Sequence, residues 1–372
     1  MVQKEYMKNV LYVGRFELPD KNAAAHRVIN NAKILRELGY NVCFCGIEKT
    51  IDLIYEEKIF GFENYPIIYN KSFFSRIKSL VSFGFIKKLI IEKKIDTIIC
   101  YNPHFLTLKK LIRYCKKHSI KIIGDITEWY DNNFSLKPIK FFRFLDTQFV
   151  MRKYNKKLDG IIAISSFLEK YYSKNLDVLL LPPLIDISDD IWNQEIDYCS
   201  DSCTIVYSGD PGLTKDDLLT VIKLIDMLFT NYIFKIVGIS QNQFLKLYPD
   251  QNKFLSSIKG KIVFVGRVSH KESVKFLLSS NYCFIIREPS RKNNAGFPTK
   301  FVESITSGTI TICNNFSDLK QYDFIENAYI YESNEDIIET FSNIEQKEEK
   351  QLSKVFDYHN YIECVDEFLK KI

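Results

Sequence analysis

Glycine and proline are both scarce in this chain, which holds only 14 and 10 of them among 372 residues. Such low contents exclude a collagen-like sequence and argue against a disordered or linker-rich one. Hydrophobic residues make up 46% of the sequence, which is enough for well-buried cores. Because the chain is longer than a single core usually supports, we expect two domains.

Long apolar runs are absent as well. No stretch of about 20 uninterrupted apolar residues occurs, so we expect no transmembrane helix. Residues 1–8 lead directly into a strand-like segment at 9–13, without the apolar core and cleavage site of a signal peptide. We therefore expect a cytoplasmic protein, either free or at the inner face of the cell membrane.

The cysteines give no sign of a metal site. Nine are present, an odd number, and several lie inside apolar runs, as small buried residues do in a reducing compartment. Cys199 and Cys203 have no second Cys or His pair at metal-binding spacing, so we expect no metal. The net charge of +5 suits an anionic ligand or an anionic membrane surface but establishes neither.

Short apolar segments alternate with helical patterns along the chain, which predicts α/β units with doubly wound parallel sheets. A helix is expected from Asn22 to Leu38, and the polar stretch 186–202 is the expected linker. Two such units in tandem predict a ligand-binding cleft between them. The expected strands lie at 9–13, 40–45, 96–101, 121–125, 160–164, 204–208, 234–238, 262–266, 282–286 and 309–313.

The stretch from Asn294 to Cys313 has the clearest chemical pattern. A glycine-containing turn leads into a segment with helical spacing that carries Glu303, and Gly308 then precedes a β-branched strand. Turn amides and a helix N-terminus suit an anion such as a diphosphate. The Glu303 carboxylate can accept two hydrogen bonds from vicinal hydroxyls, as in a ribose. The pattern favours a nucleotide-sugar pocket, and the alternative is an ordinary helix start with a surface Glu.

Further cations in this half are candidates for the same pocket. Gly209 and Lys215 lie in a loop between a strand and a helix, where a compact cation can meet a diphosphate. Arg287 ends the strand 282–286, and Lys300 precedes Glu303 by about one helical turn. The alternative for Lys215 is a solvated surface lysine, and Lys300 could instead pair with Glu303.

In the first half, polar and aromatic residues follow the strand 121–125. Asp125 and Glu128 can hydrogen-bond sugar hydroxyls, and the Trp129 ring can stack on a sugar. A capping Asp followed by a structural Trp is the alternative. His104, after the strand 96–101, is another candidate.

Small residues at 22–25 allow close approach to a ligand, and this segment adds three more acceptor-side candidates. These are Ala24, His26 and Arg27. Two basic amphipathic stretches, 71–94 and 137–157, suit either an anionic membrane or, as we favour, helices that cover a sheet.

The residues Gly296, Phe297, Glu303 and Gly308 resemble the donor-site signature of glycosyltransferase family 4. Ala295 stands where the first Glu of the family's Glu-x7-Glu motif is usual, and the Phe-Pro-Thr-Lys sequence resembles a variant branch. The resemblance implies GT-B architecture, with two Rossmann-like domains facing a cleft. The implied division is an acceptor domain at 1–183, a donor domain at 184–350, and helices at 351–372 that pack back on the first domain.

The resemblance also implies a function. The chain would move a hexose-type sugar from a nucleoside diphosphate donor to a glycan or lipid-linked acceptor in surface polysaccharide synthesis, with retention and without metal or other cofactor. The implied catalytic residues are Asp125, Glu128 and Lys215. The implied donor contacts are Gly209, Lys215, Arg267, Val268, Arg287, Ala295, Gly296, Phe297, Lys300 and Glu303, and the acceptor-side residues are Ala24, His26, Arg27, His104 and Trp129.

Two other functions stay open. A nucleotide-sugar epimerase shares the architecture, and a catalytically silent partner subunit is suggested by Ala295. A hydride-transfer enzyme is disfavoured because no Gly-x-Gly-x-x-Gly sequence follows the first strand. Peripheral membrane contact stays open as a further property, and we expect no nucleic-acid partner.

Overall fold

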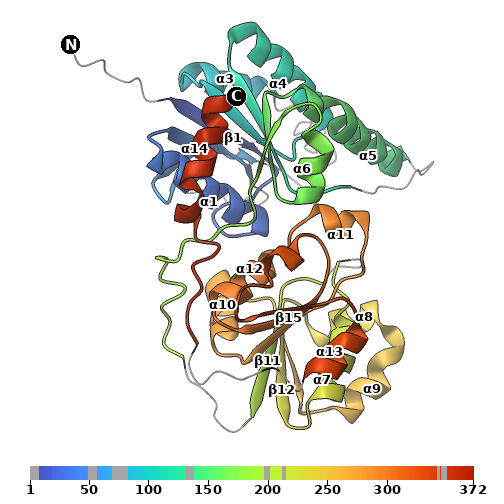
Figure 1. Cartoon of the computed structure of the whole chain (residues 1–372). Coiled ribbons are helices and arrows are strands. Elements are labelled where there is room, and N and C mark those ends of the chain that lie inside the picture. The colour runs from blue at the N-terminus through green and yellow to red at the C-terminus, as the bar shows by residue number, and fades with distance from the viewer. Residues whose placement is uncertain are drawn as a thin grey trace. The chain divides into compact units, whose positions relative to one another are not determined.

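The structure is a computed structural model of the whole chain. It describes residues 8–48, 57–68, 83–130, 138–196, 202–211, 215–341, 344 and 350–372, with only the backbone of 138–140. Two compact units are present: Met1–Leu184 together with Tyr358–Ile372, and Ile185–Asp357. Each unit contains a mainly parallel sheet with helices against it (Figure 1), so the expected α/β fold with two doubly wound units is confirmed.

The first sheet has the strand order β10-β9-β8-β7-β1-β2-β5-β4, and all its pairs are parallel except β4 with β5. The order reverses at β1, which lies between β2 and β7. The short edge strands β4 and β5 and the outer strand β10 were not predicted from the sequence. The bounds are β1 Asn9–Gly14, β2 Asn41–Cys45, β4 Lys58–Ile59, β5 Phe62–Asn64, β7 Thr97–Tyr101, β8 Lys121–Ile126, β9 Gly160–Ala163 and β10 Asp177–Leu180. A separate pair joins β3 (Ile47–Glu48) and β6 (Ile67–Ile68).

The helices of the first unit begin with α1 (Ala23–Glu37), which is capped by the Asn22 side chain and buried along most of its length. The C-terminal helix α14 buries Val365, Phe368 and Leu369 in the same hydrophobic core as α1 and β1. Helical structure in the tail starts at Tyr358, so residues 351–357, expected to be helical, belong instead to the second unit and contain no helix. The other elements are α3 Phe83–Glu92, α4 Phe105–His118, α5 Pro138–Phe149, η1 Val150–Tyr154, η2 Asn155–Lys157, α6 Ser166–Tyr172, η6 Tyr358–Tyr361 and α14 Ile362–Lys371.

The second sheet has the parallel order β13-β12-β11-β14-β15-β16, so its strand order reverses between β11 and β14. Its strands are β11 Cys203–Ser208, β12 Tyr232–Val237, β13 Ile262–Gly266, β14 Tyr282–Ile285, β15 Ile310–Asn314 and β16 Ala328–Tyr331. Its helices are α7 Leu218–Leu228, α8 Gln241–Leu247, α9 Asn252–Ser257, α10 His270–Leu278, α11 Arg291–Ala295, α12 Thr299–Thr306 and α13 Asn334–Thr340, with short turns η3 Pro249–Gln251 and η4 Leu319–Tyr322.

Each sheet buries apolar strands that read as continuous hydrophobic runs, as expected when helices cover both faces of a parallel sheet. Within the described ranges, no helix combines the length and the apolar character needed to cross a membrane.

Candidate functional site

The second unit gathers polar residues at the carboxyl ends of β11 and β14, where its strand order reverses. Tyr207 lies near the end of β11, and Arg287 follows β14 by two residues. Ligands of open α/β sheets bind in the crevice beyond such a reversal point. The topology therefore marks this edge of the sheet as the candidate site.

Asp216 is the shared hydrogen-bond acceptor at this edge of the sheet. Its carboxylate accepts a hydrogen bond from Arg287 Nε, one from Lys300 Nζ and one from the Tyr207 hydroxyl. Lys300 Nζ also donates to the Tyr207 hydroxyl at 2.8 Å and lies over its ring. We call Tyr207, Asp216, Arg287 and Lys300 the Asp216 cluster. No side chain of the cluster is more than a tenth exposed.

Burial and charge act against each other within the cluster. Burial alone would raise the pKa of Asp216, but the Lys300 ammonium and the Arg287 guanidinium lower it to about 2. Burial lowers the pKa of Lys300, and the Asp216 carboxylate opposes that change. Asp216 is therefore ionised at neutral pH and holds two cations in a region with little water.

The backbone of Arg287 is fixed by hydrogen bonds, whereas most of its guanidinium has no hydrogen-bond partner among the described residues. Its amide donates to Asn314 Oδ1 at 3.0 Å, its carbonyl accepts from Asn314 Nδ2 at 2.7 Å, and its guanidinium lies 5.2 Å from the Phe316 ring centre. Only Nε of the guanidinium has a hydrogen-bond partner among the described residues. Two nitrogens thus remain to bind an anion in the forked geometry that suits phosphate.

Glycine is required at position 209, beside the cluster. Its φ is +124°, and a Cβ there would lie 3.2 Å from Lys300 Nζ. The backbone at the end of β11 can therefore approach the buried ammonium closely. Lys215, in the same loop, is exposed, while the neighbouring Asp216 points inward.

The predicted phosphate turn lies between α11 and α12 and is held in place by Ser317. The Ser317 amide donates to Asn294 Oδ1 at 3.1 Å, and its hydroxyl donates to the Gly296 carbonyl. Ala295 is fully buried, and the Phe297 ring packs in an aromatic cluster. Its partners are Phe301, Tyr322 and Phe356.

Helix α12 follows this turn. It starts after Pro298 without a side-chain cap, so its first amides lack partners within the helix. Lys300 and Glu303 both project from it, and Lys300 reaches the Asp216 cluster.

Glu303 pairs with a residue that the sequence analysis did not select. His270, the first residue of α10, places its Nε2 3.0 Å from Glu303 Oε1, and both side chains are mostly buried. Arg267 is exposed and Val268 half-buried in the loop that leads to α10. The two residues are 33 positions apart, and no sequence motif links a histidine to a glutamate at that separation. Only the folded structure identifies this pair.

In the first unit, Asp125 belongs to a buried network. It accepts from Arg27 Nε at 2.8 Å, from Asn31 Nδ2 at 3.3 Å and from the Tyr12 hydroxyl, and it has no exposed surface. Arg27 also donates to the carbonyls of Leu181 and Pro182. These contacts join the end of β8 to α1 and to the backbone of Leu181 and Pro182, and they leave Asp125 and Arg27 buried.

The other predicted acceptor residues lie in varied surroundings. Trp129 is 3% exposed and packs edge-on against Phe167 and Tyr171, so its ring is part of the core. Ala24 and His26 are half-buried at the start of α1.

His104 contributes to an ordered helix start. Its Nδ1 lies 3.2 Å from Asp146 Oδ2, and the Phe105 amide donates to Asp146 Oδ1 at 2.8 Å. Burial would raise the pKa of Asp146, but the hydrogen bond and charge of His104, the Phe105 amide and the Arg15 charge together lower it.

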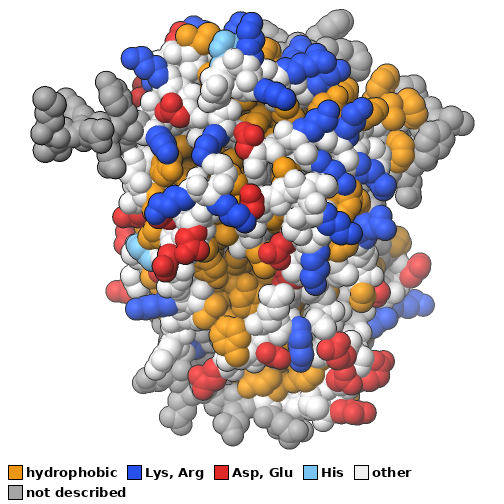
Figure 2. All heavy atoms as spheres, turned by 45° about the horizontal axis from the view of Figure 1, so that its top comes forward, with side chains coloured by type: hydrophobic (Ala, Val, Ile, Leu, Met, Phe, Trp, Pro, Cys, Tyr) orange, Lys and Arg blue, Asp and Glu red, His pale blue; other side chains and the backbone are white. Residues whose placement is uncertain are grey.

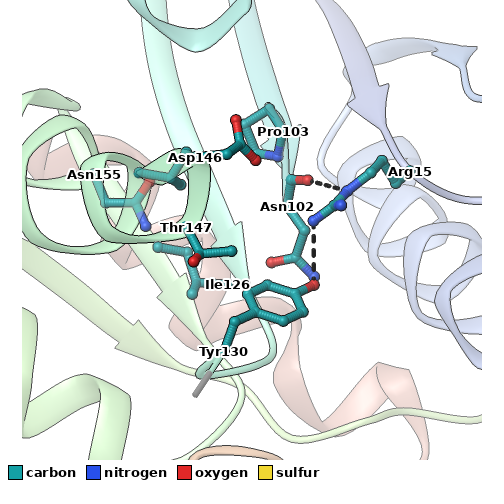
Figure 3. A pocket seen from close by; sticks show the side chains of 9 residues that line it. Arg15, Asn102, Pro103, Ile126, Tyr130, Asp146, Thr147 and Asn155 are labelled. Carbon is teal, nitrogen blue, oxygen red and sulfur yellow. Dashed lines mark hydrogen bonds between the residues drawn. The ribbon is translucent and has the colours of Figure 1, made fainter. Parts of the chain in front are cut away.

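A small pocket lies at the carboxyl ends of β1, β7 and β8, where the first sheet reverses (Figure 3). It is a hollow of about 300 Å³, open solvent included. Arg15 crosses it, donating to the Asn102 carbonyl at 2.7 Å and to the Tyr130 hydroxyl at 3.2 Å. Its lining residues are Arg15, Asn102, Pro103, Ile126, Tyr130, Asp146, Thr147, Val150 and Asn155.

The lining of this pocket mixes charge, amide groups and an aromatic ring, which is a suitable surface for a hydroxyl-rich ligand. Glu128, half-buried, lies beside it: burial and the Glu128 carboxylate raise the pKa of Tyr130. Of the predicted residues, Glu128 and His104 therefore lie at or next to this pocket, while Asp125 and Trp129 lie within the core. In the part of the chain that the structure describes, no group of three His, Cys, Asp or Glu residues could hold a metal ion.

Solved structures with the same fold are known. Sucrose-phosphate synthase from Thermosynechococcus elongatus aligns with a TM-score of 0.71 at 11% identity, covering 98% of both chains. A glycosyltransferase from Rickettsia africae aligns at 0.68 and 15% identity, covering 98% of this chain and 100% of its own. Anabaena HepE, solved in complex with UDP and glucose, aligns at 0.68 and 11% identity, again covering 98% and 100%.

This likeness shows the fold, and it confirms the predicted GT-B architecture. No family model and no curated protein sequence matches the chain.

Proposed function

We propose that this protein is a glycosyltransferase that takes a nucleoside diphosphate sugar as its donor. The observation that carries the proposal is the Asp216 cluster at the reversal point of the second sheet, in which two guanidinium nitrogens of Arg287 have no hydrogen-bond partner among the residues that the structure describes. Proteins that share this fold include glycosyltransferases, and one of them was solved with UDP. Both facts favour a donor site in the second unit.

The donor diphosphate is proposed to bind Arg287 and Lys300. Asp216 orients both cations before the ligand arrives, which lowers the cost of ordering them. Gly209 and the amides of Gly296 and Phe297 would complete the phosphate contacts, with Lys215 approaching from the exposed side of the loop. Glu303, oriented by His270, would accept hydrogen bonds from the ribose hydroxyls.

Departure of the nucleoside diphosphate is the step that these residues would assist. The bond between the anomeric carbon and the diphosphate oxygen breaks, and negative charge grows on that oxygen. Fixed cations and amides around it stabilise this charge more than that of the bound donor. We propose that transfer occurs with retention and without a metal ion.

The acceptor is proposed to be a glycan or a lipid-linked glycan in surface polysaccharide synthesis. The pocket of Figure 3 supports an acceptor site in the first unit, because its arginine, carboxylate, amides and tyrosine suit sugar hydroxyls. Glu128 and His104, which were selected from the sequence, lie at or next to this pocket and are proposed to contribute to the acceptor site.

A thermal-shift screen against UDP, GDP, ADP, CMP and their sugar conjugates tests the donor site, because a ligand that binds only the folded state raises its melting temperature. We expect a rise with one nucleotide and its conjugates. No rise with any of them would contradict a preformed donor site.

Turnover of the donor distinguishes a glycosyltransferase from the second candidate function, a catalytically silent subunit. Ala295 offers no carboxylate and is fully buried, and this is the observation that supports the second candidate. We expect nucleotide release when acceptor glycans are added to the bound donor. Binding without any release would favour the silent subunit.

A further inference from the structure

The outer face of α4 is strongly basic. Leu106, Lys110, Arg113 and Lys117 are spaced four, three and four residues apart, so they lie along one side of the helix, and all four are exposed. Leu106 is 42% exposed. Nothing in α4 balances this charge, since the helix contains no acidic residue.

The neighbouring helix α5 adds exposed aromatic rings. Phe142 is 68% exposed and Phe149 is 38% exposed, and seven residues, about two turns, separate them along the helix. The Phe149 ring lies 5.4 Å from that of Phe105, the residue before Leu106. Helices α4 and α5 pack against each other, and we call their exposed apolar side chains, Leu106, Phe142 and Phe149, the α4–α5 patch.

The segments that carry the α4–α5 patch are rich in basic residues. Residues 105–118 and 141–157 contain ten Lys or Arg and a single acidic residue, Asp146, whereas the whole chain has 51 and 46. Asp146 is held by His104 and by the Phe105 amide. Figure 2 shows Lys and Arg side chains gathered with hydrophobic ones at its upper right, where α4 and α5 lie.

The patch adjoins the pocket of Figure 3. Asp146 lines the pocket and lies on α5 between Phe142 and Phe149. Pro103, another lining residue, lies two residues before the start of α4. A surface that covered the patch would therefore lie beside the mouth of the pocket.

We propose that the α4–α5 patch binds a membrane that contains anionic lipids. The apolar side chains enter the interface between headgroups and acyl chains, and the surrounding lysines and arginines contact the lipid phosphates. The pocket is then held at the membrane surface, where the sugar of a lipid-linked acceptor can reach it. This last step rests on the proposed function, whereas the membrane contact does not.

Vesicle sedimentation with the full chain tests the contact, comparing phosphatidylcholine vesicles with vesicles that also contain phosphatidylglycerol. We expect binding to the anionic vesicles and little to the neutral ones. The triple variant Lys110→Glu, Arg113→Glu, Lys117→Glu removes three positive charges, adds three negative ones and should weaken binding by more than about tenfold.

A matched control makes the same three changes at exposed lysines of the second unit. These are Lys223→Glu, Lys246→Glu and Lys275→Glu on α7, α8 and α10. The control should retain most of the binding, because it alters net charge equally but leaves the patch intact. A separate variant, Phe142→Ser, should weaken binding by several-fold without changing the charge.

Three results would overturn the proposal. They are no binding to anionic vesicles at low salt, an equal loss in the control triple variant, or binding to RNA or another soluble polyanion without binding to vesicles. An unchanged affinity for Phe142→Ser would exclude insertion of the apolar residues. Nucleotide binding in solution, measured on the same variants, does not depend on the patch. If no nucleotide binds, that result counts against the donor site and not against the membrane contact.

Discussion

Replacing Asp216 with asparagine leaves two buried cations without their shared counterion. Lys300 and Arg287 each bond to one carboxylate oxygen, and both are 9% exposed, so water cannot replace the lost charge. Removing one member of a buried ion pair costs about 3–5 kcal/mol, because the other charge stays buried and uncompensated. Since two cations depend on Asp216, we expect a loss of stability of about this size at neutral pH.

Urea unfolding of the second unit measures this loss. The chain has two tryptophans, Trp129 in the first unit and Trp192 in the second, so fluorescence in a Trp129→Phe background reports on the second unit. With a urea dependence of about 1–3 kcal/mol per molar, a loss of that size moves the midpoint down by at least about 1 M. Asp250→Asn, at an exposed aspartate of the same unit, is the matched control and should leave the midpoint unchanged.

The difference should depend on pH. The folded pKa of Asp216, about 2, lies below the ordinary value of about 3.9. The carboxylate therefore contributes its full stability above about pH 4, and this contribution is lost as the pH falls toward 2. The stability gap between the wild type and Asp216→Asn should shrink over this range. A loss below about 1 kcal/mol at pH 7, or a gap that is the same at pH 2.5, would refute the reasoning.

Three further predictions concern ligand binding and the glycine at 209. Glu303→Ala should weaken nucleotide binding by about 1–3 kcal/mol in calorimetry, because a charged acceptor for a bound hydroxyl is lost; unchanged affinity would remove Glu303 from the site. His270→Ala should cause a smaller loss in the same assay, since it only frees the Glu303 carboxylate, and a loss larger than that of Glu303→Ala would contradict this order. Gly209→Ala should lower both the melting temperature and the nucleotide affinity, because it strains a φ of +124° and displaces Lys300; an unchanged melting temperature would contradict this.

The sheets could be predicted because buried parallel strands appear as apolar runs bounded by helical patterns. Strands β1, β7 and β14 therefore lie within two residues of their predicted limits. The edge strands β4 and β5 have only two and three residues, and too few side chains alternate there to give a signal. The tail segment 351–357 carries helical composition, but its backbone bonds to other parts of the second unit, where the Ser353 amide donates to the Thr306 carbonyl and the Phe356 carbonyl accepts from the Ile185 amide.

The sequence predicted several residues of the candidate site but not which side chains contact one another there. Arg287 and Lys300 stood out as cations near strand and helix ends, but nothing in the sequence linked them to Asp216, which lies 71 and 84 residues away. Asp125 looked equally suited to a sugar, since a carboxylate after a strand gives the same pattern whether it faces a ligand or a buried arginine. The structure shows that it pairs with Arg27, 98 residues away in the sequence.

The most direct test of the donor site is calorimetric titration with the nucleoside diphosphate that gives the largest thermal shift. The wild type, Arg287→Gln and Lys223→Ala, a change at an exposed lysine on α7, are compared after a check that each is folded. We predict that the wild type and Lys223→Ala bind alike and that Arg287→Gln binds at least about tenfold more weakly, as expected when a charged hydrogen bond to phosphate is lost. Equal affinity in all three proteins would contradict the assignment of the diphosphate to the Asp216 cluster.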